Sequence, residues 1–148
     1  MVYKIVLLLH VLAATIWTGG HLILAVGFLP RALRAKDFTV IEQFEGPFEK
    51  LGIPALLIQI LTGIWLAFRY LPEMSDWFGF DNYLSTGITL KFILLGLTLG
   101  LALHARLRLI PNISEKNMNY LAWHILSVTI LSVLFVIVGV GIRIGGYF

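Results

Sequence analysis

Long apolar runs, separated by short polar segments, dominate the pattern of this sequence. The apolar runs cover about residues 3–29, 51–68, 84–109 and 119–142. A helix rises about 1.5 Å per residue, so runs of roughly 18 residues or more match the ~30 Å hydrocarbon core of a bilayer. The pattern therefore predicts an all-α integral membrane protein, a four-transmembrane-helix bundle that forms a single domain over residues 1–148.

Prolines and polar residues set the expected ends of these spans. Proline lacks a backbone N–H and is tolerated best in the first turn of a helix. The first span is expected to stop at Pro30 and Arg31, the third is expected to stop before Pro111, and Pro54 fits the first turn of the second.

The polar connections carry patterns of their own. In the first connection, Phe38, Ile41, Phe44 and Phe48 recur every three or four residues, which predicts a short amphipathic helix on the membrane surface. The second connection is rich in aromatic residues, including Trp77, and predicts an interfacial loop. The acidic residues are all expected outside the spans: Asp37, Glu42, Glu45, Glu49, Glu73, Asp76, Asp81 and Glu115.

Composition agrees with lipid as the main partner. Apolar residues make up 59% of the chain, and charged residues make up 13%. The net charge of +3 comes from basic residues beside the spans, which points to lipid headgroups and not to nucleic acid. There is no cysteine, which excludes disulfides, thiolate metal sites and c-type haem attachment.

The basic residues also predict an orientation. Seven of them flank the first and third connections, whereas four lie on the opposite side. The positive-inside rule then places the first and third connections in the cytoplasm. We expect a multi-pass protein of the inner (cytoplasmic) membrane with both termini outside.

Four histidines lie within the predicted spans, where polar residues are costly and therefore informative. His21, His104 and His124 fall at similar depths near the cytoplasmic side of three helices, whereas His10 lies nearer the outer side. On the first helix, His10, Trp17 and His21 share one face, which is expected to point inward. Lys91 lies nearly opposite His104 on the third helix and is expected to reach outward to the membrane surface.

Imidazole binds haem iron, copper and zinc well. Two histidines on facing helices can clamp a b-type haem, and three at one level can bind copper or zinc directly. Arg106 can pair with haem propionates. The candidate cofactor-binding set is therefore His10, His21, His104, His124, Trp17 and Arg106, with the four histidines as metal ligands. The alternative for each histidine is an interhelical hydrogen bond, for Trp17 simple packing, and for Arg106 a membrane anchor.

The first span resembles the copper-resistance D (CopD-like) membrane family in residues 9–20, which read LHVLAATIWTGG. The resemblance continues in residues 29–33 (LPRAL), 61–63 (LTG), 87–91 (GITLK) and 106–111 (RLRLIP). It implies a small membrane protein linked to copper handling or haem, and it marks His10 by position. The spacing of histidine and tryptophan and the presence of Lys91 are also similar to HemJ-like haem-binding membrane proteins.

Three functional hypotheses follow. The first is a b-type haem protein for membrane electron transfer, with quinone or another redox protein as its partner. Membrane oxidoreductase activity and a homo-oligomeric state are both compatible with this hypothesis. The second is a CopD-like copper transport or copper-homeostasis protein that binds copper through the same histidines. The third is a membrane subunit whose histidines only hold helices together. The sequence identifies no catalytic residue.

Overall fold

The computed structural model describes residues 1–112 and 117–147. Within them, four helical segments are long and apolar enough to cross a membrane: Val2–Ala35, Thr39–Tyr70, Tyr83–Leu109 and Met118–Ile144. The described part of the chain contains no strand. The predicted fold class, an all-α bundle of four transmembrane helices, is confirmed.

The first span continues past the point where proline was expected to end it. It consists of α1 (Val2–Ile23), the π-helical turn η1 (Leu24–Phe28) and α2 (Leu29–Ala35). Pro30 lies at the start of α2, directly after the wider π turn. Because a π turn changes the hydrogen-bond register, the missing N–H of Pro30 does not interrupt the helical path. The segment ends at Lys36, which adopts a left-handed conformation with φ of 53°.

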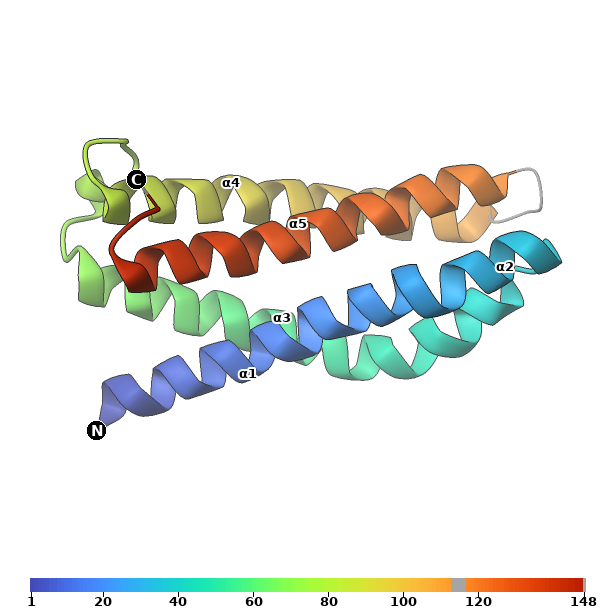
Figure 1. Cartoon of the computed structure of the whole chain (residues 1–148), viewed down its shortest axis with the longest axis horizontal. Helices are drawn as coiled ribbons and strands as arrows, with labels where there is room; N and C mark the ends of the chain where they lie inside the picture. Colours follow the sequence, from blue (N-terminus) through green and yellow to red (C-terminus); the bar gives the residue numbers. More distant parts are fainter. Residues whose placement is uncertain (113–116, 148) are drawn as a thin grey trace.

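The second span, α3 (Thr39–Tyr70), begins well before the predicted start at residue 51. The Asp37 carboxylate accepts hydrogen bonds from the backbone N–H and the hydroxyl of Thr39, at 2.9 and 2.7 Å. These bonds lower the pKa of the Asp37 carboxyl. Pro47 and Pro54 both lie inside the helix, and α3 is visibly bent along its length (Figure 1).

The predicted surface helix is therefore the first part of α3, and its aromatic stripe faces the bundle. Ile41 is 1% exposed. Phe44 packs on Phe28 of η1 with ring centroids 4.8 Å apart, and it stacks on Phe48 at 5.4 Å. The prediction of a separate interfacial helix was wrong, because these side chains find apolar partners on the first span instead of lipid.

The remaining elements are η2 (Met74–Trp77), α4 (Tyr83–His104), the π turn η3 (Ala105–Leu109), η4 (Ile110–Asn112) and α5 (Met118–Ile144). A capping box starts α4: the Asn82 side chain accepts from the backbone N–H of Ser85, and the Ser85 hydroxyl accepts from the backbone N–H of Asn82.

The loop between α3 and α4 is more than an interfacial loop. Trp77 is 2% exposed, and its indole N–H donates to the backbone carbonyl of Leu71 at 2.8 Å. Its ring packs against Phe68 and Phe92. These contacts fold the predicted interfacial loop back onto the bundle.

The four spans pack in the order α3, α1, α5, α4, and the two outer helices of this row do not close into a ring. α1 packs against α3 and α5, and α5 packs against α4, whereas α3 and α4 make almost no contact. Both chain termini and the α3–α4 connection lie at one end of the bundle, which we call the terminal end (Figure 1). The α1–α3 connection, η4 and the start of α5 lie at the other end, which we call the loop end. Large apolar side chains are exposed on all four spans, as a bilayer requires, for example Val26, Leu61, Leu103 and Trp123.

The main apolar core lies towards the loop end. It joins η1, α2, the start of α3, η3 and the start of α5 through Leu24, Ala25, Leu29, Ala32, Ile41, Leu109, Leu121, Ala122 and Ile125. A smaller core at the terminal end contains Ala67, Trp77 and Ile88.

Candidate metal site

A cavity of about 130 Å³ lies between the four spans, next to the main core. Its lining comes from α1, η1, α3, α4, η3 and α5: Trp17, His21, Leu24, Glu45, Thr98, Ala102, Ala105, His124, Ile125 and Val128. Both π turns border it, through Leu24 and Ala105. Since π turns occur often at functional sites, this position is itself informative.

His21 is held with one ring nitrogen free. Its Nδ1 lies 2.8 Å from the backbone carbonyl oxygen of Trp17. A carbonyl can only accept, so Nδ1 carries the proton and Nε2 keeps its lone pair. The ring packs against Trp17 at 4.5 Å and against Phe48 at 5.5 Å between centroids. In metal-binding histidines, a hydrogen bond from the other ring nitrogen fixes the tautomer and the orientation of the ring. The contacts of His21 do the same.

His124 lines the cavity from α5, and His104 stands beside it. The two imidazole rings are 5.9 Å apart between centroids. The Nε2 atom of His104 lies 3.3 Å from the Tyr120 hydroxyl, outside the lining of the cavity. Three histidines from three helices thus gather at this level, and two of them face the cavity.

Glu45 is a lining residue that the sequence analysis placed outside the membrane. It is partly buried, whereas Glu42 and Glu49 on the same helix are exposed. The extension of α3 carries Glu45 into the bundle. A signal was present in the sequence, because Glu45 shares a helical face with Ile41 and Phe48 at spacings of four and three residues.

Thr98 adds a second unexpected polar group. Its side chain lines the cavity from α4 and is 1% exposed. Among the described residues, its hydroxyl oxygen has no hydrogen-bond partner. A buried hydroxyl without a partner is costly, above all in a membrane. Thr98 therefore places a hydroxyl without a protein partner next to the cavity.

His10 lies elsewhere, in the terminal half of the bundle. Its Nδ1 is 2.8 Å from the Thr62 hydroxyl oxygen on α3. That hydroxyl donates to the backbone carbonyl of Ile58 at 2.5 Å, so it accepts the proton of His10. This bond matches the structural alternative weighed for intramembrane histidines.

Lys91 does not reach outward as predicted. Its Nζ lies 3.3 Å from the point where a Cβ on Gly139 of α5 would stand. The absence of a side chain at Gly139 leaves room for the ammonium between α4 and α5.

The two remaining candidate residues, Trp17 and Arg106, also differ in whether they reach the cavity. Trp17 lines the cavity, but Arg106 does not: it is 67% exposed and forms an ion pair with Glu49 at 2.8 Å. No three histidine or acidic side chains in the described ranges are grouped closely enough to hold one metal ion together. Any ion in the cavity would therefore depend on two of these side chains.

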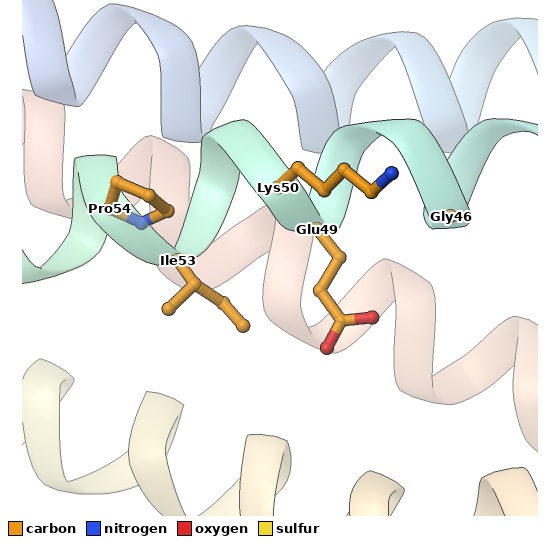
Figure 2. A pocket seen from close by; sticks show the side chains of 5 residues that line it. All are labelled: Gly46, Glu49, Lys50, Ile53 and Pro54. Atoms are coloured by element: carbon orange, nitrogen blue, oxygen red, sulfur yellow. The ribbon is translucent and has the colours of Figure 1, made fainter.

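A second hollow, of about 440 Å³, lies beside α3 and is lined by Gly46, Glu49, Lys50, Ile53 and Pro54. Figure 2 shows the side chains of Glu49 and Ile53 pointing towards α4, and that of Lys50 pointing along α3. All five residues belong to one helix, and none is a histidine. This hollow is a surface feature and not a metal site.

Comparison with known proteins assigns the family. The model of the family described as "Copper resistance protein D" (CopD) matches residues 42–142, which is more than half of the chain. The chain belongs to the CopD family. No curated protein and no solved structure matches it. The CopD match covers Glu45, Thr98, His104 and His124. The first span, whose residues carry much of the resemblance seen in the sequence, lies outside the match.

Membership of the CopD family favours copper over haem. The main sequence-based hypothesis, a b-type haem, finds no support in the family match. The cavity of about 130 Å³ is also small for such a group, since pockets for organic ligands usually measure roughly 300–1,000 Å³. The alternative hypothesis, copper handling, agrees with the family and with the imidazoles at the cavity.

Proposed function

We propose that this CopD protein handles copper in the membrane and binds the ion as cargo in the cavity between its four spans. The observation that carries the proposal is the convergence of His21 from α1 and His124 from α5 on one cavity. The rest of the bundle interior is largely apolar. Imidazole is a good copper ligand, and a protein without cysteine has few others to offer.

Each side chain then has a distinct task. His21 presents Nε2, because its Nδ1–H is used on the Trp17 carbonyl. His124 supplies the second nitrogen, and Glu45 supplies negative charge next to a bound cation. His104 supports His124 from the side. His10 stays a prediction from the family resemblance, and its pairing with Thr62 gives it a structural task in the proposal.

The position of the cavity fits a transport step. The main apolar core, with Leu24 and Ile125 at its boundary with the cavity, closes the path towards the loop end. An ion in the cavity can pass to that side only if this core opens, and the π turns η1 and η3 border the same place. We assign the loop end to the cytoplasm of an inner-membrane protein, because described basic residues that flank the first and third connections, such as Arg34 and Arg106, lie there. The whole chain acts as one domain.

Equilibrium copper titration of the detergent-purified protein, with an absorption spectrum of the same sample, tests the proposal. Wild type is expected to bind copper and to lack a Soret band. His21→Ala and His124→Ala should each weaken binding by about tenfold or more, the scale of losing a group that orients or ligates a metal. His10→Ala is the matched control, since it removes an intramembrane histidine outside the cavity. A haem spectrum, or equal copper affinity in all three variants, contradicts the proposal.

A further inference from the structure

The cavity has one acidic side chain, which can carry a single negative charge beside a bound cation. Of its ten lining residues, Glu45 alone is acidic, and none is lysine or arginine. The nearest acids along α3, Glu42 and Glu49, are exposed, and Glu49 is neutralised by Arg106 at 2.8 Å. The imidazole of His21 that binds a metal is neutral. The cavity thus offers one carboxylate against the charge of whatever enters it.

A single carboxylate matches a monovalent ion. Charge that is not compensated costs several kcal/mol in the interior of a membrane protein, so a site is most favourable when the bound state is neutral. One positive charge beside Glu45 gives a neutral site. A divalent ion leaves one positive charge in excess, and Glu45 is the single acidic side chain among the described residues that line the cavity.

The ligand geometry points the same way. Zinc in proteins takes four tetrahedral ligands, and Cu(II) prefers a square of nitrogen and oxygen ligands. In the described part of the chain, no three histidine or acidic side chains are placed to hold one ion. A filled-shell monovalent ion needs only two nitrogen ligands, and His21 and His124 line the cavity from two helices that pack against each other. The unpartnered Thr98 hydroxyl adds a neutral polar contact without changing the charge.

We infer that the cavity selects a monovalent ion, Cu(I), and that Glu45 sets this selectivity by neutralising a single charge. The inference rests on the proposed function and deepens it, because it names the oxidation state of the cargo and the residue that discriminates.

The test uses full-length protein in lipid nanodiscs and calorimetric titration with two redox-inert probes, Ag⁺ and Zn²⁺. Wild type should bind one Ag⁺ per chain in a His21-dependent site, and Zn²⁺ should bind at least about tenfold more weakly, a difference of roughly 1.4 kcal/mol. Glu45→Gln should weaken Ag⁺ binding by about tenfold. Glu45→Asp keeps the charge and should restore most of the affinity.

The matched control is Glu49→Gln, which removes a carboxylate one turn further along the same helix, outside the cavity. It should leave Ag⁺ affinity within about twofold of wild type. Thermal unfolding of each variant, together with the Glu45→Asp rescue, separates a loss of charge from a loss of fold.

Two results overturn the inference: Zn²⁺ binding as tight as Ag⁺ binding in wild type, or unchanged Ag⁺ affinity in folded Glu45→Gln. If either occurs while copper binding still depends on His21 and His124, the proposed function stands and only the selectivity fails. If His21→Ala and His124→Ala also leave Ag⁺ and copper binding unchanged, both fail.

Discussion

Two groups of polar side chains, one in each half of the bundle, differ in their hydrogen bonding. In the terminal half, His10 is bonded to Thr62, and the Tyr3 hydroxyl lies 3.0 Å from that of Tyr70 and accepts a hydrogen bond from Arg143. In the loop half, the Thr98 hydroxyl has no partner among the described residues, and His21 uses only one of its ring nitrogens on the protein backbone.

This difference separates structural polarity from functional polarity. In lipid, polar side chains that only hold helices together are expected to satisfy one another, as His10 and Thr62 do in the terminal half. Polar groups that lack a protein partner lower the stability of the fold, but they remain free to bind a ligand. The comparison therefore assigns the binding role to the loop half, although the family resemblance in the sequence marks His10.

The largest effect is expected from displacing the Phe48 ring, which packs against His21 in the loop half. A Cβ on Gly20 would overlap the ring of Phe48, which packs edge-on against His21. Gly20→Leu should cost about 1–3 kcal/mol of stability through overpacking and should also weaken copper binding. Thermal unfolding and copper titration measure the two effects. Gly19→Leu is the control, because a Cβ there meets nothing within 4 Å. Equal behaviour of the two variants would show that Phe48 does not position His21.

Gly87, in the terminal half, tests whether a packing change far from the cavity affects copper binding. A Cβ on Gly87 of α4 would lie 2.5 Å from Cγ1 of Ile142 on α5. Gly87→Ala should cost about 1 kcal/mol, at the lower end of overpacking because Ile142 can move slightly. Copper affinity should stay within about twofold of wild type, because the cavity lies in the other half. A loss of affinity equal to the loss caused by Gly20→Leu would mean that the two halves are coupled.

The sequence predicted the membrane spans and the gathering of histidines for a clear physical reason. Hydropathy averaged over some 20 residues locates each span, and a rise of about 1.5 Å per residue gives the depth of a residue within its span. Sequence position alone therefore predicted a similar depth for His21 and His124. The bond between His10 and Thr62 was foreseen only as an alternative, because it depends on which face of α3 meets α1.

Residues whose position depends on packing could not be predicted in this way. Glu45 was assigned to a surface connection, because an acid next to a polar segment is ordinarily solvated; the continuation of α3 through Pro47 decides otherwise. Lys91 was expected to reach the surface, since nothing in the sequence of α4 reveals the space that Gly139 leaves on α5. Arg106 was a candidate for haem propionates and is paired with Glu49 instead.

The smallest predicted effect tests the structural task of His10. Thr62→Val removes the hydroxyl that accepts the Nδ1 proton of His10 at 2.8 Å and keeps the shape of the side chain. Interhelical hydrogen bonds in membrane proteins average about 0.6 kcal/mol, so the free energy of unfolding should fall by roughly that amount. Chemical unfolding in detergent measures it, and copper affinity should not change. If Thr62→Val weakens copper binding as strongly as His21→Ala does, His10 belongs to the ion's path. The terminal half would then take part in function, as its resemblance to the family motif implies.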